Sequence, residues 1–171
     1  MKKAFTLIEL LIVIIIMGVV YKLAINNFAK LSDESQKLTL QNLREYLNSL
    51  PHAKSVKLLC LDDCEECSIY IDGVKNKEID GFLDHSVRSY RYEFSYGFVE
   101  TQKEVVFDKH DVQKDVCFSY KIDKKGVGDQ VLVEYKDGFY DLGAYIQKTP
   151  HYTSMQEVVD AKEALIQKVM R

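Results

Sequence analysis

The chain has 171 residues, of which 47% are hydrophobic and 29% are charged, and its net charge at pH 7 is −3. These proportions are typical of a folded protein, and the length leaves room for one modest globular domain. Residues 51–171 hold 17 Lys and Arg against 22 Asp and Glu, and this excess of negative charge argues against a protein that binds nucleic acid through a broad basic surface.

The first element is an apolar run that follows Lys2 and Lys3. From residue 5 to residue 21 the only charged side chain is that of Glu9. A buried core helix is not favoured, because a helix that is apolar on every face, without a 3.6-residue stripe, has no polar side to turn to water. About 20 apolar residues span a bilayer, and residues 5–25 nearly supply them. The two lysines predict a cytoplasmic amino terminus, with the residues after Tyr21 outside the inner membrane.

Glu9 is the residue that a plain membrane anchor leaves unexplained. A carboxylate at the centre of a membrane helix costs about 2.5 to 3.5 kcal/mol, so such a residue usually has a partner. A secretory signal peptide would explain the lysines and the apolar run, but no convincing small-x-small cleavage site follows. A single-pass anchor whose Glu9 reaches toward the interface is the alternative.

The segment Lys3-Ala-Phe-Thr-Leu-Ile-Glu-Leu10 resembles the class III signal of type IV prepilins and type II secretion pseudopilins. In that family a membrane peptidase cuts before the Phe, and the new amino terminus is methylated. The resemblance implies cleavage between Ala4 and Phe5, N-methylation of Phe5, and a contact in the filament between Glu9 and a neighbour's amino terminus. The family usually has Gly where this chain has Ala4, which predicts slower processing.

A long helix is predicted to continue beyond the membrane. Apolar residues recur at spacings of three and four up to Pro51, which ends the helix because proline disfavours helical geometry in the preceding residue. The result is one helix about 70 Å long. A leader peptide at 1–4 precedes this helix, which consists of a transmembrane and assembly part at 5–25 and an amphipathic continuation at 26–50. Asn26 and Asn27 stand where many major pilins have a kinking proline, which favours a minor pilin or pseudopilin.

Residues 51–171 are predicted to form a periplasmic domain rich in strands. A hairpin loop is expected at 62–66, a two-residue turn at Asp137-Gly138, and irregular structure at 73–86. Ser154-Met-Gln-Glu157 has capping-box form and starts a C-terminal helix at 154–170, whose apolar face docks on its own sheet or on a partner. The fold class is α+β, a long N-terminal helix packed on a mainly antiparallel sheet. Strands are predicted at 56–61, 67–72, 89–96, 104–108, 116–122, 130–135 and 139–142.

The four cysteines are predicted to form two disulfides, because disulfides are stable outside the inner membrane. Cys64-Glu-Glu-Cys67 also has the spacing of a zinc knuckle or a redox dithiol, but no second closely spaced Cys/His pair and no strand-to-helix context supports either. Three connectivities are possible. The favoured one joins Cys60 to Cys67 across the hairpin and Cys64 to Cys117.

Five aromatic residues alternate with other residues in the segment 90–98. On one strand they would share a face that packs on the amphipathic helix, and base stacking is the less favoured alternative. These aromatic residues are Tyr90, Tyr92, Phe94, Tyr96 and Phe98.

No enzyme, cofactor or metal site is predicted. The sequence has no nucleophile motif, phosphate loop or zinc-hydrolase pair, and its histidines are scattered. Weak calcium binding at the hairpin tip is less favoured than a solvated tip, because no oxygen-ligand loop with a central glycine is present. The acidic residues of that tip are Asp62, Asp63, Glu65 and Glu66.

The sequence therefore predicts a minor pilin or pseudopilin, a structural subunit of a type IV pilus, type II secretion or DNA-uptake filament in the bacterial inner membrane. Its expected partners are the prepilin peptidase, other pilin or pseudopilin subunits and the inner-membrane assembly platform, and strong nucleic-acid binding is not expected. The alternatives are a non-polymerising anchored periplasmic binding module and the major pilin itself.

Overall fold

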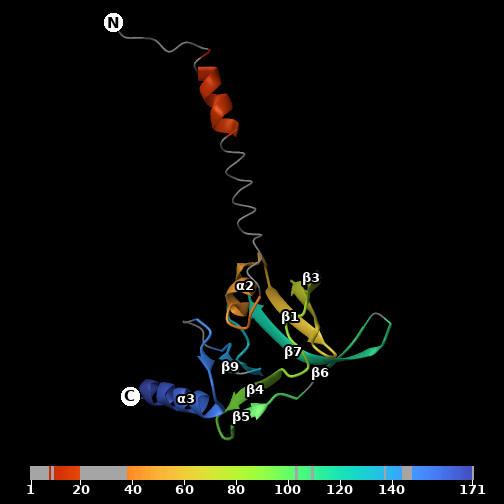
Figure 1. The fold of residues 1–171 in the computed structure, drawn as a ribbon, viewed down its shortest axis with the longest axis vertical. Coiled ribbons are helices and arrows are strands. Elements are labelled where there is room, and N and C mark those ends of the chain that lie inside the picture. Colours follow the sequence, from red (N-terminus) through yellow and green to blue (C-terminus); the bar gives the residue numbers. More distant parts are fainter. Residues whose placement is uncertain are drawn as a thin grey trace. The chain divides into compact units, whose positions relative to one another are not determined.

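The computed structural model describes residues 8, 10–19, 38–102, 104–108, 110–136, 138–143 and 148–170. The chain divides into two units, Met1–Lys37 and Leu38–Arg171. In the first unit, residues 10–19 are α-helical (Figure 1). The second unit contains two antiparallel sheets, so the predicted α+β class with an antiparallel domain and a short terminal helix is confirmed.

Each sheet of the second unit has five strands, in the orders β3-β2-β1-β7-β6 and β10-β9-β8-β4-β5 (Figure 1). The helices are α2 (Leu43–Ser49) and α3 (Met155–Val169). The strands are β1 (Ser55–Leu61), β2 (Glu66–Ile71), β3 (Val74–Asp80), β4 (Arg88–Glu93), β5 (Gly97–Glu100), β6 (Glu104–Phe107), β7 (Gln113–Asp123), β8 (Leu132–Tyr135), β9 (Gly138–Asp141) and β10 (His151–Tyr152).

Helix α2 covers one face of the first sheet, where it contacts β1 and β7. Its residues Leu43 and Leu47 are four positions apart, so they lie on one side of the helix, and both are completely buried. The helix ends as predicted, because Leu50 has an extended backbone with ψ 130° just before Pro51.

The prediction of one continuous helix up to residue 50 is wrong in its last part. Residues 38–42 form coil and turn before α2 begins. The Thr39 amide donates to Asn42 Oδ1 at 2.8 Å, and the Asn42 amide donates to Thr39 Oγ1 at 3.3 Å. Such local bonds compete with helical ones, which explains the interruption. The predicted helical residues 20–37 lie outside the described residues.

Strand β7 provides the centre of the core. Phe118, Tyr120 and Ile122 alternate along it and are 2%, 0% and 0% exposed, so they share the inner face. The Tyr120 hydroxyl donates to the Leu142 carbonyl at 3.2 Å, which links the first sheet to the chain just after β9. Burial raises the pKa of Tyr120 to about 12.

Strand β3 occupies part of the segment that was predicted to be irregular, so that prediction is wrong for residues 74–80. Ile71 pairs with Val74 across a two-residue turn. The turn residues Asp72 and Gly73 have φ values of 53° and 88°, as type I′ hairpin turns require. Strand β3 is an edge strand on which Ile79 is the only residue that is not exposed. It therefore lacks the alternating pattern that reveals a half-buried strand.

The hairpin of β8 and β9 is displaced by one residue from its predicted turn. Tyr135 pairs with Gly138, so Gly138 is the first residue of β9 and Lys136, with φ 53°, lies in the turn. A Cβ atom at Gly138 would collide with the imidazole of His151. Glycine therefore allows the His151 ring of β10 to pack closely on β9, and it is not part of the turn itself.

Helix α3 begins as its capping sequence predicts. Ser154 Oγ accepts from the Glu157 amide at 3.3 Å, while the Glu157 carboxylate accepts from the Thr153 amide at 2.9 Å. Val158 is 3% exposed, and Lys162 Nζ lies 5.2 Å from the centroid of the Tyr92 ring. The first turns of α3 thus dock on their own domain, whereas three apolar residues of the last turns are exposed, namely Leu165, Val169 and Met170.

The Asp72 carboxylate joins the β2–β3 turn to the start of β1. It accepts from the Ala53 amide at 2.9 Å. It also accepts from the amides of Lys54 and Ser55 at 2.6 and 3.0 Å. These bonds favour the charged form and hold the pKa of Asp72 below its usual value.

The variant Asp72→Ala is expected to unfold at a lower temperature than the wild type at neutral pH, and this difference should become smaller in acid, where only the strain of alanine at the positive φ of position 72 remains. A carboxylate whose pKa is depressed contributes stability above its unfolded pKa of about 3.9 and loses it as the pH falls through the folded value. Thermal melts of residues 38–171 from about pH 6 to about pH 2 measure this. Asp80→Ala on the neighbouring edge strand is the control, and a difference that grows in acid would contradict the assignment.

Candidate functional site

The helix of the first unit exposes apolar side chains around its whole circumference. Residues 10–17 and 19 are all apolar, and their exposed fractions run from 39% for Val13 to 66% for Met17. A helix of this kind is stable only where apolar surroundings cover it, such as lipid or other apolar helices.

No helix among the described residues is both long enough and apolar enough to cross a membrane. The predicted processing residues Ala4 and Phe5 and the predicted assembly residue Glu9 lie outside the described residues. Of the predicted span at 5–25, the structure describes residues 8 and 10–19.

The four cysteines form a cluster that ties β1, β2, the hairpin loop and β7 together. Cys60 and Cys67 are directly paired in the β1–β2 register, with their Cα atoms 4.0 Å apart, and are bonded to each other. Cys64 bonds to Cys117, with a Cα separation of 5.7 Å. This is the connectivity that the sequence favoured. With their sulfurs in disulfide bonds, these residues cannot act as thiolate ligands or as a reduced dithiol.

The acidic hairpin tip beside the disulfides is held by a lysine. Asp62 Oδ2 lies 2.6 Å from Lys114 Nζ, and the Asp62 amide donates to the Asp115 carbonyl at 2.8 Å. The hydrogen bond from Lys114 lowers the pKa of Asp62. Within the described ranges, no three His, Cys, Asp or Glu side chains are placed to share a metal ion.

The four histidines lie in separate places. His151 packs against Tyr140 with ring centroids 4.8 Å apart. His85 and His110 are exposed in loops, and His52 contacts main-chain carbonyls at the end of α2. The structure therefore brings none of them together as a pair.

The prediction that five aromatic residues share one strand face is wrong. Glu93 pairs with Gly97, so residues 94–96 form a three-residue loop between β4 and β5. Gly97 has φ 76°, as the residue after such a loop often requires. Phe94 and Tyr96 are 84% and 81% exposed at this tip. The sequence did not reveal this turn, because a loop of three residues with a serine at its centre keeps the alternation of aromatic and other residues unbroken.

The other three aromatic residues have different surroundings. Tyr92 and Phe98 face each other across the β4–β5 hairpin, with ring centroids 5.2 Å apart in an edge-to-face arrangement. The Tyr90 hydroxyl donates to Glu134 Oε2 at 2.5 Å. None of these contacts involves the amphipathic segment at 26–50, which was their predicted partner.

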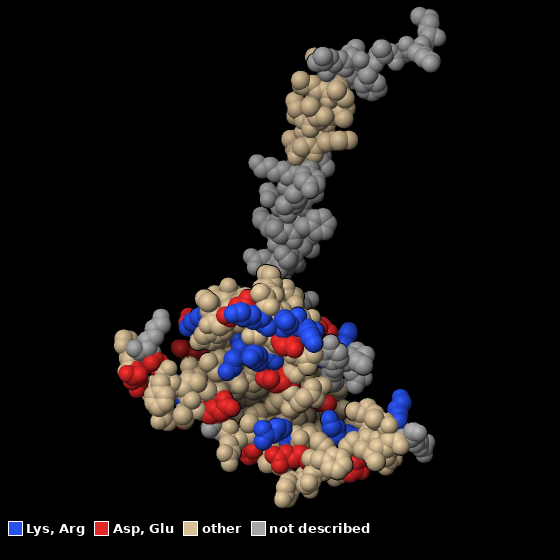
Figure 2. All heavy atoms as spheres, turned by 180° about the vertical axis from the view of Figure 1, so that it is seen from behind, with Lys and Arg blue, Asp and Glu red and all other residues tan. Residues whose placement is uncertain are grey.

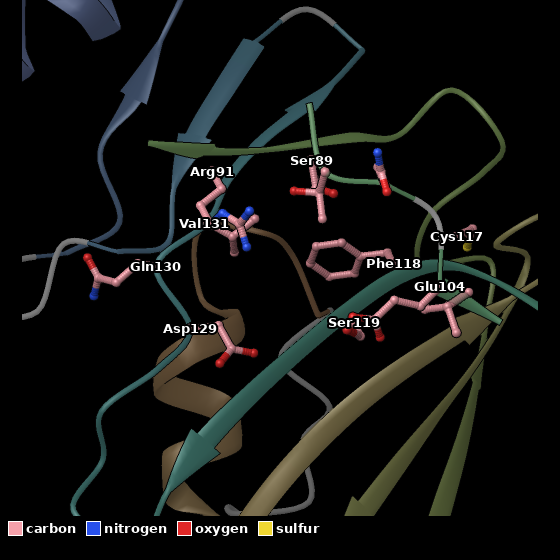
Figure 3. A pocket seen from close by; sticks show the side chains of 12 residues that line it. Ser89, Arg91, Glu104, Cys117, Phe118, Ser119, Asp129, Gln130 and Val131 are labelled. Atoms are coloured by element: carbon pink, nitrogen blue, oxygen red, sulfur yellow. The ribbon is translucent and has the colours of Figure 1, made fainter. Parts of the chain in front are cut away.

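A cleft of about 390 Å³ with a mixed polar and apolar lining lies between the two sheets. Figure 3 shows Ser89 and Arg91 of β4 on one side and Ser119 of β7 with Glu104 on the other. Its lining contains no histidine, and Cys117 at its edge is in a disulfide. No local pattern in the sequence points to this cleft, because its walls come from strands far apart in the chain.

The charges around this region do not form a basic surface. Arg91 Nη2 lies 3.2 Å from Glu93 Oε1, and the pKa of Arg88 is raised by Tyr90 and by the charges of Glu100 and Glu134. On the face shown in Figure 2, Lys and Arg are interspersed with Asp and Glu. The two arginines nearest the aromatic residues are therefore accompanied by carboxylates.

Comparison with known proteins identifies the amino-terminal segment. Residues 1–20 match the family described as the prokaryotic N-terminal methylation motif. The chain thus carries the class III prepilin signal of type IV pilins and pseudopilins, as the sequence predicted. This motif supports a pilin-like structural subunit, and it implies membrane anchoring, processing by prepilin peptidase and assembly with other pilins. No curated protein and no solved structure shows significant similarity to the chain.

Removing the long disulfide is expected to destabilise the domain more than removing the short one. The bonds close separations of 53 and 7 residues, for which the loss of unfolded-chain entropy corresponds to about 4 and about 2.5 kcal/mol. Urea unfolding of residues 38–171 would compare Cys64→Ala/Cys117→Ala with Cys60→Ala/Cys67→Ala. Each pair removes two sulfurs, so the second double variant is the matched control.

Thiol labelling of the wild type without reductant should be negligible. Stoichiometric zinc with thiols that become reactive after chelation would contradict the disulfides. Equal losses of stability in the two double variants would contradict the argument from loop length.

Proposed function

We propose that this chain is a minor pilin or pseudopilin, a structural subunit of a type IV pilus, type II secretion or DNA-uptake filament. The observation that carries the proposal is the methylation motif at residues 1–20. The helix at 10–19 supports it, because its exposed apolar side chains need the cover that lipid supplies before assembly and neighbouring helices supply afterwards.

The proposed subunit has a cytoplasmic amino terminus, one membrane pass and a periplasmic domain. The disulfides of that domain agree with an oxidising compartment. After cleavage, extraction from the membrane leaves the apolar helix free to pack in a filament. In this scheme the assembly platform of the inner membrane inserts the subunit into the filament. The surface of the periplasmic domain determines which partners the subunit binds.

Glu9 has a proposed role in assembly. Within a bundle of apolar helices its carboxylate would pair with the methylated amino terminus of Phe5 in a neighbouring subunit, and this contact neutralises both charges. In a single-pass anchor that does not polymerise, this carboxylate would have no partner. Glu9 therefore distinguishes a filament subunit from an anchored binding module that never polymerises.

A strong nucleic-acid receptor is not part of the proposal. Residues 51–171 carry 17 Lys and Arg against 22 Asp and Glu, and Arg91 is paired with Glu93. The net repulsion of phosphates leaves little electrostatic driving force for binding to duplex DNA.

The mature chain is expected to begin at Phe5 with one added methyl group. Intact-mass measurement of the membrane-extracted protein tests this, with cells that lack the prepilin peptidase as the control. Ala4→Gly should raise the processed fraction, because the peptidase of this family usually meets Gly there, and Ala4→Leu should lower it. A mature protein that retains residues 1–4 in peptidase-positive cells would remove the main support for the proposal.

Glu9→Leu is expected to leave membrane insertion near normal while strongly reducing incorporation into filaments. Removing one partner of a buried charge pair costs about 3 to 5 kcal/mol, because the other charge is left without compensation. Incorporation is measured in sheared filaments, or by crosslinking to neighbouring subunits at native expression. Ile12→Leu is the matched control within the same helix. Wild-type incorporation and machine activity in Glu9→Leu would show that Glu9 is not an assembly contact.

A further inference from the structure

His52 bridges the end of α2 and the end of β7. Its Nδ1 atom lies 2.7 Å from the Leu50 carbonyl oxygen, and its Nε2 atom lies 3.2 Å from the Asp123 carbonyl oxygen. The side chain is part-buried. The bridge joins residues 71 positions apart in the sequence, at the point where the chain leaves α2 and enters the first sheet.

Both partners of the imidazole are carbonyl oxygens, which accept hydrogen bonds and cannot donate them. A neutral imidazole has one N–H, so it can satisfy only one of these partners and turns a lone pair toward the other. The imidazolium form carries an N–H on each nitrogen and can donate to both. The geometry around His52 is therefore matched to the protonated ring.

The negative charges near the ring also favour its protonated form. The two carbonyl hydrogen bonds are the main reason that the pKa of His52 is raised, burial opposes them, and the negative charges of Asp72 and Asp123 add to the increase. The β2–β3 turn contributes Asp72, and the end of β7 contributes Asp123. The positive charges of Lys124 and Lys125 act on the Asp123 carboxylate.

Each carboxylate near His52 is held in place by main-chain amides. Asp72 accepts from amides that include that of Ala53, next to His52 in the chain. Asp123 Oδ1 accepts from the amides of Lys125 and Val127 at 2.8 and 2.9 Å. At the carboxyl end of α2, the carbonyl of the capping residue Leu50 contacts the ring. The charge of Arg44, also on α2, acts on Tyr120.

We propose that His52 is a pH-sensitive latch that, when protonated, holds the carboxyl end of α2 on the end of β7 and, when deprotonated, releases one of these two contacts. A group whose pKa is raised on folding contributes its full stability below its unfolded pKa of about 6.5 and loses it as the pH rises through the folded value. The contact between the end of α2 and the first sheet is therefore more stable at mildly acidic pH than at alkaline pH. A periplasmic domain in particular would experience such a change, since small ions equilibrate with the medium.

The first test is an NMR titration of the full chain in detergent micelles with labelled histidine. The sequence has only four histidines, and His52→Gln assigns the signal. The expected result is a midpoint for His52 above the ordinary value of about 6.5, with both ring nitrogens protonated on the acid side. A midpoint at or below that value, or a neutral tautomer in mild acid, would overturn the proposal.

The second test is hydrogen exchange of the α2 amides, including those of Tyr46 and Leu50, corrected for the intrinsic effect of pH. In the wild type, protection should fall about two- to tenfold across the His52 midpoint, as expected for the loss of one hydrogen bond. His52→Gln should show the lower protection at both pH values, and His85→Gln in an exposed loop should behave as the wild type. Equal wild-type protection on both sides of the midpoint would show that the ring does not latch α2. The wild-type comparison stands even if His52→Gln fails to fold.

Discussion

The packing of α2 on the inner face of the first sheet is the contact on which the rest of the domain depends. Leu43 and Leu47 meet the side chains that β1 and β7 turn inward, and all of these side chains are almost completely buried. Burying one such leucine contributes about 1.5 to 3 kcal/mol. Directly after α2, the Leu50 carbonyl contacts the His52 ring. The Tyr120 hydroxyl donates a hydrogen bond to the Leu142 carbonyl, which connects this core to the chain after β9.

The disulfides reinforce the same sheet. Cys60–Cys67 joins two strands that are already paired, whereas Cys64–Cys117 joins the hairpin loop to β7. The second bond closes a long loop, so it restricts the unfolded chain more. A domain of this size buries a limited apolar area, and crosslinks compensate for that limit.

The two units have separate physical requirements, which agrees with a subunit that anchors, assembles and presents a domain. The helix at 10–19 exposes apolar groups that need an apolar environment. The domain has mixed charges on the face shown in Figure 2, a cleft between its sheets and an exposed aromatic tip at Phe94 and Tyr96. These features offer contacts for partners, and the junction at His52 lies where α2 meets the sheet.

The sequence by itself determined the features that depend on neighbours in the chain. The methylation motif, the end of α2 before Pro51, the cap of α3 and the cysteine hairpin are local signals, and each was predicted from a few adjacent residues. Only the tertiary structure decided the rest. The edge strand β3 lacks an apolar pattern, the loop at 94–96 interrupts a pattern that reads as one strand, and the His52 bridge joins residues far apart. The physical reason is that burial and long-range hydrogen bonds depend on which distant segments meet, and no local pattern records that.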